Sequence, residues 1–187
     1  MRKPALISAL LLLGAALSGC TKQAIQLTYD KQEANIDKVV ESVLKQDENA
    51  TVEYPDGVVR IRLSASTSVE SDPQLEKGGK ISFYYGGYTL PSTSISTSNL
   101  FATNLKDLAD ASGWSNVDES AFEQEEVVIG KGELVQGLER GLIGVRKGDN
   151  VLILFSGKYG WGNRPRGIVP ARSALAWQIW VVDVTND

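Results

Sequence analysis

The chain has 187 residues, a length that predicts one domain or one domain with an appendage. Its 19 Lys and Arg residues against 23 Asp and Glu residues give a formal charge of −4, which argues against nucleic-acid binding because that function normally needs a basic surface. The absence of histidine and the single cysteine exclude a Ser-His-Asp or Cys-His nucleophile, a His/Cys zinc site and an intramolecular disulfide. Any chemistry must therefore depend on backbone groups, aromatic rings, carboxylates or the shape of a pocket, and no cofactor is expected.

The first residues have the pattern of a cleaved export signal. Residues 1–19 combine a basic start with an apolar run, 5–17, that is too short for an ordinary membrane-spanning helix. The run ends in Leu17-Ser18-Gly19-Cys20, which resembles a bacterial lipobox, although a plain signal with a chance cysteine is the alternative. In the lipobox interpretation Cys20 is the acylated N-terminus, residues 20–28 are a lipidated tether, and two or more acyl chains anchor the protein to a membrane. Thr21 stands where a retention signal would place Asp, so we expect the bacterial cell envelope, at the outer membrane, as the location.

Residues 29–71 are predicted to form a helix followed by a β-hairpin. A helix is expected over 29–46 with Asp30 as its N-cap, because apolar residues recur there on one helical face. These are Ile36, Val39, Val40, Val43 and Leu44. From 51 to 63 the pattern changes to alternation around the turn Pro55-Asp56-Gly57, which is typical of a hairpin. Roughly 40 residues rarely bury enough surface for an independent domain, so this segment is expected to pack as an extension on the rest of the chain.

Residues 72–187 are dominated by strand patterns and one short helix. Strands are expected at 80–88, 127–129, 150–155 and 175–184. An amphipathic helix that ends at Gly148 is predicted from the helical spacing of Leu134, Val135, Leu138, Leu142 and Val145. A helical turn is expected at 105–111, and loops at 64–71, 91–99, 118–126 and 157–170. The predicted class is α+β with an antiparallel sheet.

Five segments in this part of the chain carry a family pattern. They are Lys77-Gly78 with the strand end Tyr84-Tyr85-Gly86-Gly87, the stretch 128–139, its continuation 141–149, Tyr159-Gly160-Trp161-Gly162 and Gly167-Ile168-Val169-Pro170. In this order they resemble the FKBP-type peptidyl-prolyl isomerases, from about residue 78 to residue 184. The resemblance implies an FKBP-like domain over 72–187, in which an antiparallel β-sheet wraps around a short helix. The N-terminal helix and hairpin are then an extension of that domain.

The resemblance also implies peptidyl-prolyl cis-trans isomerase activity. Rotation about an X-Pro bond has a barrier of about 18–20 kcal/mol, because the twisted amide loses resonance. No bond breaks, so an apolar pocket with few water molecules is needed rather than a nucleophile, a metal or a cofactor. The expected partners are proline-containing polypeptide clients, with macrolide inhibitors as further ligands of the pocket.

Ten residues are placed at the pocket by the resemblance. Those expected to act on the twisted bond are Tyr85, Phe101, Trp161 and Ile168, and those expected to bind substrate are Leu134, Val135, Leu138, Tyr159, Val169 and Trp177. Leu138 takes the place of the family's pocket-floor tryptophan, and Trp177 that of a phenylalanine on the last strand. The Val135 N–H is expected to donate a hydrogen bond to a substrate carbonyl.

Two departures from the family pattern affect the pocket. Ala102 stands where the family has an acidic residue, and Glu125 stands where it has a second aromatic, unless Phe122 takes that place. Glu125 also belongs to an acidic cluster with Glu123 and Glu126, which is expected to be solvated rather than a metal site. The pocket positions have a plainer interpretation as well, since any sheet packed on a helix needs apolar side chains there.

Three functions therefore remain open. The first is a lipid-anchored isomerase that assists the folding of exported proteins. The second is a low-turnover, chaperone-like lipoprotein that holds proline-containing segments. The third is a structural lipoprotein of an envelope assembly.

Overall fold

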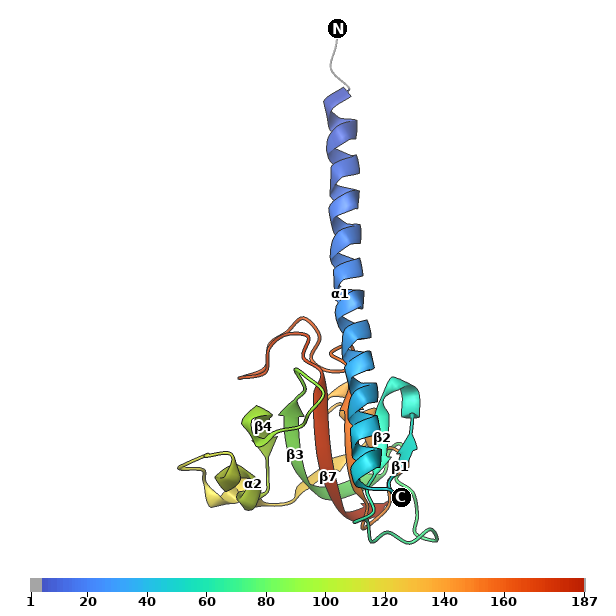
Figure 1. Cartoon of the computed structure of the whole chain (residues 1–187), viewed down its shortest axis with the longest axis vertical. Helices are drawn as coiled ribbons and strands as arrows, with labels where there is room; N and C mark the ends of the chain where they lie inside the picture. The colour runs from blue at the N-terminus through green and yellow to red at the C-terminus, as the bar shows by residue number, and fades with distance from the viewer. Residues whose placement is uncertain (1–4, 187) are drawn as a thin grey trace.

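A long helix and a twisted sheet make up most of the chain (Figure 1). The computed structural model describes the backbone of residues 5–186 and the side chains of residues 22–186. Helix α1 (Ala5–Gln46) lies against the sheet with its C-terminal turns and projects away from it toward its N-terminal end (Figure 1). The shorter helices are α2 (Lys106–Ala111) and α3 (Gln136–Leu142), with 3-10 turns at Pro55–Gly57, Thr97–Asn99 and Glu119–Phe122. Among the described residues, no helix has an apolar stretch of the length needed to cross a membrane.

Within residues 5–186, seven strands form one antiparallel sheet. They are β1 (Thr51–Glu53), β2 (Val59–Arg62), β3 (Lys80–Thr89), β4 (Leu100–Thr103), β5 (Glu125–Val128), β6 (Asn150–Phe155) and β7 (Leu175–Thr185). Their order is β1-β2-β6-β7-β3-β4, and β5 also pairs with β3. Strand β3 is long enough to pair with β5 through its first residues and with β4 through its last, while β7 runs along its whole length. The hairpin β1–β2 is part of this sheet, because β2 pairs with β6.

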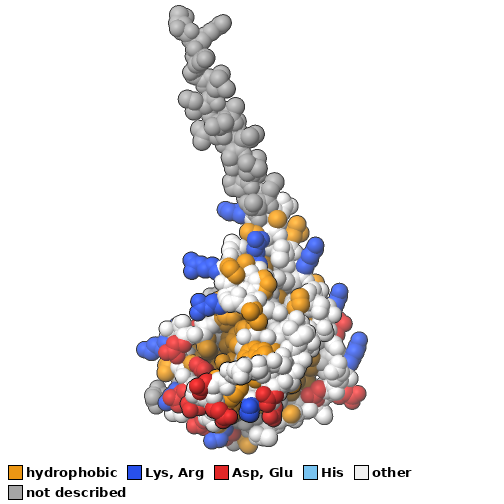
Figure 2. Space-filling view, turned by 90° about the vertical axis from the view of Figure 1, so that its left-hand side faces the viewer, with side chains coloured by type: hydrophobic (Ala, Val, Ile, Leu, Met, Phe, Trp, Pro, Cys, Tyr) orange, Lys and Arg blue, Asp and Glu red, His pale blue; other side chains and the backbone are white. Residues whose placement is uncertain are grey.

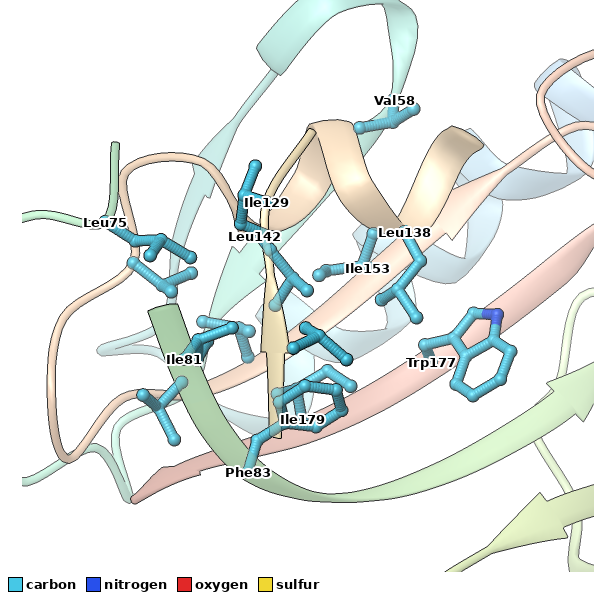
Figure 3. Close-up of a cluster of buried hydrophobic side chains, with 14 of the residues drawn as sticks. Val58, Leu75, Ile81, Phe83, Ile129, Leu138, Leu142, Ile153, Trp177 and Ile179 are labelled. Carbon is cyan, nitrogen blue, oxygen red and sulfur yellow. The ribbon is translucent and has the colours of Figure 1, made fainter. Parts of the chain in front are cut away.

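Two glycines let helix α3 approach one face of the sheet closely. Gly137 and Gly141 are four residues apart, so they lie on the same side of the helix. A Cβ atom on Gly137 would lie 2.4 Å from the ring of Phe155, and one on Gly141 would lie 2.3 Å from a methyl group of Ile153. Both neighbours are buried side chains of β6, so any larger residue would push α3 away from the sheet. Leu138 points from the seated helix into the buried cluster (Figure 3).

The side chains of β6 alternate between two hydrophobic cores, as the period of a strand requires. Val151, Ile153 and Phe155 face α3, whereas Leu152 and Leu154 face α1. On the α1 side the core includes Ile36, Val39 and Val40, which are 3%, 3% and 7% exposed. Each buried aliphatic side chain contributes about 1.5–3 kcal/mol, so these residues hold the C-terminal half of α1 on the sheet.

The hairpin is tied to the end of α3 by Arg60. This side chain is 5% exposed and donates hydrogen bonds to the carbonyls of Gly141 (2.9 Å) and Ile143 (2.5 Å), and it pairs with Glu53. Carbonyls in the last turn of a helix have no partner within the helix, so the guanidinium group satisfies groups that would otherwise be unpaired. The N-terminal segment therefore supplies the hydrogen-bond donors that the last turn of α3 lacks.

A second ion pair joins β2 to the start of β6. Asp149 is 1% exposed and accepts hydrogen bonds from Arg62 (2.9 and 3.1 Å) and from the Arg146 N–H (2.8 Å). Burial alone would raise the pKa of Asp149, but hydrogen bonds from Arg62, Ser68 and the Arg146 N–H outweigh it and hold the pKa below its ordinary value. Asp149 is therefore ionised at neutral pH and stabilises the fold in that form.

Charged side chains are unevenly distributed on the face that Figure 2 shows. Basic side chains stand along α1, where Lys22, Lys31, Lys38 and Lys45 are located, and acidic side chains gather on the lower part of the sheet-based body. Basic side chains also stand on the body among the acidic ones in this view, and α1 carries acidic residues as well (Asp30, Glu33, Asp37 and Glu41), so the two signs of charge are not separated between the helix and the body.

The predicted fold class is confirmed, with corrections in detail. Asp30 is not an N-cap, because α1 runs through it. Residues 22–28, expected as part of a tether, belong to the same helix and contain no Gly or Pro and many good helix formers. Helix α3 is shorter than predicted, because the backbone is extended at Val135 and Ile143. Strand β4 was not predicted, and Glu125 and Glu126 lie in β5 rather than in a loop because they pair with β3. The side chains of the predicted lipobox, including Cys20, lie outside the described residues.

Candidate functional site

A cavity of about 190 Å³ lies between α3, the sheet and the loop that connects β6 to β7. Its lining comes from β3, β5, the segment before α3, α3 itself, the connecting loop and β7. The lining residues are Phe83, Tyr85, Glu125, Glu133, Leu134, Val135, Leu138, Trp161, Arg166 and Trp177. Leu138 on α3 and Trp177 on β7 lie at one end of the main hydrophobic cluster (Figure 3). Elements from distant parts of the sequence therefore converge on one small space that has an apolar floor and charged side chains in its lining.

Aromatic rings form the floor and one wall of this cavity. The Trp177 ring lies 5.3 Å from that of Phe101 at an interplanar angle of 86°, and 5.5 Å from that of Tyr85 at 54°. Trp161 lies 5.7 Å from Phe101 at 74°. Edge-to-face contacts at these distances are favourable for aromatic pairs, so the four rings support one another.

Tyr85 is held by two polar side chains at the end of β4, one on its last residue and one on the residue after it. Thr103 Oγ1 donates to the Tyr85 carbonyl (2.6 Å), and Asn104 Oδ1 accepts from the Tyr85 N–H (2.7 Å). Asn104 is 3% exposed, and its Nδ2 also donates to the carbonyls of Phe83 (3.2 Å) and Glu123 (2.9 Å). These side chains bridge β3 at the point where its pairing changes from β5 to β4, and so they orient Tyr85 toward the cavity.

The Tyr85 hydroxyl remains protonated over the ordinary pH range. Burial raises the pKa of Tyr85, and the negative charge of Glu125 raises it further. The hydroxyl is therefore available as a hydrogen-bond donor beside an apolar floor.

The backbone at the start of α3 presents a donor to the cavity. Val135 precedes the helix in an extended conformation (φ −64°, ψ 141°), and its carbonyl accepts the first helical hydrogen bond from Glu139 (3.0 Å). In the described part of the chain, the N–H of Val135 donates to no other group. Because Val135 lines the cavity, this N–H can serve a bound carbonyl oxygen.

This arrangement can be compared with known proteins. The sequence matches the FKBP-type peptidyl-prolyl cis-trans isomerase family over residues 72–182, more than half of the chain. The chain belongs to the FKBP family. The family match begins just before β3 and ends within β7, so it includes every element that lines the cavity.

Individual relatives agree with this assignment. Over 58 residues the FKBP chain is 34% identical to the mouse protein peptidyl-prolyl cis-trans isomerase FKBP9, a match that covers 31% of this chain. The chain spans about a tenth of the length of that relative.

Three solved structures share the fold. The structure of the three FKBP domains of wheat FKBP73 matches with a TM-score of 0.55 at 17% identity. The match covers 74% of this chain and 52% of the wheat chain. FkpA from Escherichia coli has a TM-score of 0.52 at 14% identity over 99% of this chain and 74% of its own. A peptidyl-prolyl cis-trans isomerase from Pseudomonas syringae pv. tomato has a TM-score of 0.51 at 13% identity, over 83% of this chain and 96% of its own.

Most residues predicted for the FKBP pocket lie together in the structure. The six that line the cavity are Tyr85, Leu134, Val135, Leu138, Trp161 and Trp177. Phe101 does not line it but packs behind it against Trp161 and Trp177.

Three predicted pocket residues lie elsewhere. Ile168 is 76% exposed, because a bridge between Arg166 and Val169 places it at the tip of a tight turn that points into solvent. Val169 is buried in the main core instead of lining the cavity. Tyr159 does not line the cavity; its ring packs against the main core and lies 4.7 Å from the Arg140 guanidinium.

Sequence reasoning missed several groups at the rim of the pocket. Glu133 and Arg166 line the cavity beside Glu125, so the entrance carries charge. Phe122 does not replace the missing aromatic, because it lies outside the cavity with Lys106 over its ring. Only the position of Glu125 was signalled in advance, through its departure from the family pattern.

Two other kinds of site can be compared with this cavity in the described part of the chain. Among residues 22–186, no three acidic, Cys or His side chains lie close enough together to hold a metal ion. A larger cleft of about 410 Å³ lies between α1, the end of β3 and residues 170–174, but its walls carry no aromatic ring.

Proposed function

We propose that this FKBP chain is a peptidyl-prolyl cis-trans isomerase that twists X-Pro bonds in the cavity beside α3. The observation that carries the proposal is one small space with an aromatic floor and a backbone N–H that has no partner among the described residues. Trp177 and Leu138 supply the apolar surface, and the Val135 N–H supplies the donor. No ionisable group is needed in such a reaction, because no bond is made or broken.

The apolar surface of the cavity can lower the rotational barrier, because it replaces water around the amide. A planar amide is more dipolar than a twisted one, so water stabilises the planar ground state more than the transition state. Walls formed by Tyr85, Leu138 and Trp177 replace that water with apolar surface, which reduces the penalty of about 18–20 kcal/mol for rotation. The Val135 N–H holds a flanking carbonyl of the substrate and so fixes one side of the rotating bond.

The volume of the cavity also suits a single side chain. Pockets for drug-sized ligands usually measure about 300–1,000 Å³. At about 190 Å³ the cavity is smaller, which favours one prolyl ring with the rest of the client lying outside. Proline-containing polypeptides are therefore the proposed clients, and macrolides that carry a proline-like ring are the proposed inhibitors.

A second candidate is binding with little turnover. It is favoured by Glu125, which brings a carboxylate to the cavity wall where the family has an aromatic residue, and by Ala102, which replaces an acidic residue behind the floor. A chaperone-like lipoprotein would hold proline-containing segments in the same pocket without twisting them quickly.

A protease-coupled assay on a prolyl peptide separates these functions. The isomerase predicts catalysed isomerisation that falls at least about tenfold in Tyr85→Ala and in Trp177→Leu, a loss of roughly 1.4 kcal/mol. Glu123→Ala, an exposed residue outside the cavity, is the matched control and should keep the wild-type rate. Peptide binding without isomerisation would favour the second candidate, and neither binding nor isomerisation would refute both.

For the location we propose a lipid anchor at Cys20 in the outer membrane of a bacterial envelope, with exported proteins as clients. The support is the segment Leu17-Ser18-Gly19-Cys20 with the only cysteine at its end. From Cys20 to Gln32, where α1 bonds to the loop of the body, the helical rise of 1.5 Å per residue would leave about 18 Å of helix between the lipid and the isomerase body. Cys20→Ser should lose partitioning into the detergent phase, and a mutant that still partitions there would refute the anchor.

A further inference from the structure

One side chain of α1 binds both ends of the loop that carries part of the pocket rim. Gln32 Nε2 donates to the Arg172 carbonyl (2.6 Å), and Gln32 Oε1 accepts from the Gly157 N–H (2.8 Å). Gly157 opens the connection between β6 and β7, and Arg172 stands near its end. We call these two residues the neck of the loop. In Figure 1 this loop lies beside α1 at the N-terminal end of β7.

The neck is a tight arrangement with little freedom of its own. Arg172 has a φ of 61°, a conformation that non-glycine residues rarely adopt, and its N–H bonds to the Gly162 carbonyl (2.5 Å). A Cβ atom on Gly157 would lie 2.5 Å from the Arg172 carbonyl oxygen, so the two backbones are in direct contact. One amide side chain with one donor and one acceptor therefore fastens both sides of the neck at once.

The loop beyond the neck reaches the proposed active site. Trp161 and Arg166 line the cavity, and Trp161 packs on Phe101. The Tyr159 carbonyl also accepts a hydrogen bond from the Gly137 N–H (2.8 Å) in the first turn of α3, two residues after Val135. A shift of the neck would thus move the rim directly and the start of α3 through one hydrogen bond.

Gln32 lies where α1 and the loop are otherwise poorly packed. The cleft of about 410 Å³ opens beside it, and Gln32 is one of its walls. The neighbouring contact from Ser156 Oγ to Glu33 is longer, at 3.4 Å. One turn further along, Ile36, Val39 and Val40 fix the helix to the sheet. The helix is therefore a firm support, and Gln32 makes the shortest hydrogen bonds between that support and the loop.

We infer that Gln32 is a positioning residue for the isomerase pocket, so that the N-terminal helix acts on the site through the neck of the loop. The inference rests on the proposed function, because it describes how that pocket is kept in shape. It assigns α1 a role in activity in addition to that of a spacer.

The test compares three variants of the full chain. Gln32→Ala removes both hydrogen bonds, and Gln32→Glu keeps the acceptor for Gly157 but not the donor to Arg172. Gln46→Ala is the matched control, because Gln46 lies on the same helix and bonds only to Ser42 within it. The measurements are kcat/KM and Kd for a prolyl peptide, made at a temperature at which thermal unfolding curves show every variant fully folded. Hydrogen exchange of the Gly157 amide is followed in parallel.

We expect Gln32→Ala to lower kcat/KM by roughly threefold to tenfold, as the loss of two ordinary hydrogen bonds allows, and to speed exchange at Gly157. Gln32→Glu should fall between Gln32→Ala and the wild type, and Gln46→Ala should match the wild type. An active wild type with unchanged kcat/KM and Kd in Gln32→Ala would overturn the inference, even if the variant melts at a lower temperature. A wild type that neither binds nor isomerises would instead overturn the proposed function and, with it, the inference.

Discussion

Trp177 offers a test of how the floor of the pocket is built, because it combines a buried ring with an unpaired donor. The residue is 8% exposed, and its indole Nε1 is buried without a hydrogen-bond partner in the described part of the chain. Trp177→Phe removes that donor and keeps a ring that can contact Tyr85 and Phe101. Trp177→Ala removes both the donor and the ring.

The two substitutions should differ widely in their effect on stability. Large aromatic side chains bury about 150–250 Å², so the step from Trp to Phe loses a few tens of Å², or about 1 kcal/mol at roughly 25 cal/mol per Å². Removing a buried donor that has no partner stabilises the folded state by about 1–3 kcal/mol, which is at least as large as the loss from the smaller buried area. Trp177→Phe should therefore leave the free energy of unfolding unchanged or slightly raised. Trp177→Ala should cost about 3–5 kcal/mol, as truncation of a buried aromatic usually does.

Urea unfolding followed by far-ultraviolet circular dichroism measures both changes without relying on tryptophan emission. The affinity for a prolyl peptide should stay within about threefold in Trp177→Phe and fall at least about tenfold in Trp177→Ala, since a factor of ten corresponds to roughly 1.4 kcal/mol. A loss above about 2 kcal/mol in Trp177→Phe would mean that the indole N–H is in fact paired, and the reasoning would fail.

Three further predictions concern the scaffold of the pocket. Gly141→Ala should lower stability by about 1–3 kcal/mol in thermal unfolding, although alanine favours a helix, because its methyl group would overlap a buried side chain of β6. Since the pKa of Asp149 is depressed in the folded state, its stabilisation is complete above the unfolded pKa of about 3.9 and is lost as the pH falls through the folded pKa. In Asp149→Asn, the unfolding free energy should therefore fall less steeply than in the wild type as the pH is lowered from about 5 to about 2. An unchanged slope of unfolding free energy against pH would contradict this role of Asp149. Asn104→Ala should cost about 1–3 kcal/mol and lower kcat/KM for a prolyl peptide, because it leaves the Tyr85 N–H unpaired; the exposed Ser98→Ala is its control.

Whether the chain isomerises X-Pro bonds quickly or binds them with little turnover depends on the charged part of the pocket wall. Glu125 and Glu133 bring carboxylates to the cavity, and Arg166 brings an opposite charge to it. These groups lie around an apolar floor, so they can affect the rate without preventing a prolyl ring from entering. The isomerase assay therefore carries more weight than the fold in deciding the activity.

The sequence by itself determined the architecture and most of the floor of the site. The apolar runs of β6 and β7 and the helical spacing around Leu138 are local patterns that can be recognised within a few residues of sequence. The glycine-rich segments, in their order along the chain, indicated the FKBP family. The family pattern in turn predicted that Tyr85, Leu138 and Trp177 meet at one cavity. Local periodicity did not reveal strand β4, whose place depends on pairing with the end of β3.

Only the tertiary structure decided which groups complete and support the site. Ile168 is exposed because its loop folds back on itself, and Asn104 supports Tyr85 because two strand pairings meet beside it. The contacts of Gln32 join residues separated by 125 and 140 positions in the sequence. A polar side chain on an amphipathic helix has the same local pattern whether it faces solvent or a distant loop. Its role is therefore set by the packing of α1 on the sheet, which no stretch of the sequence encodes alone.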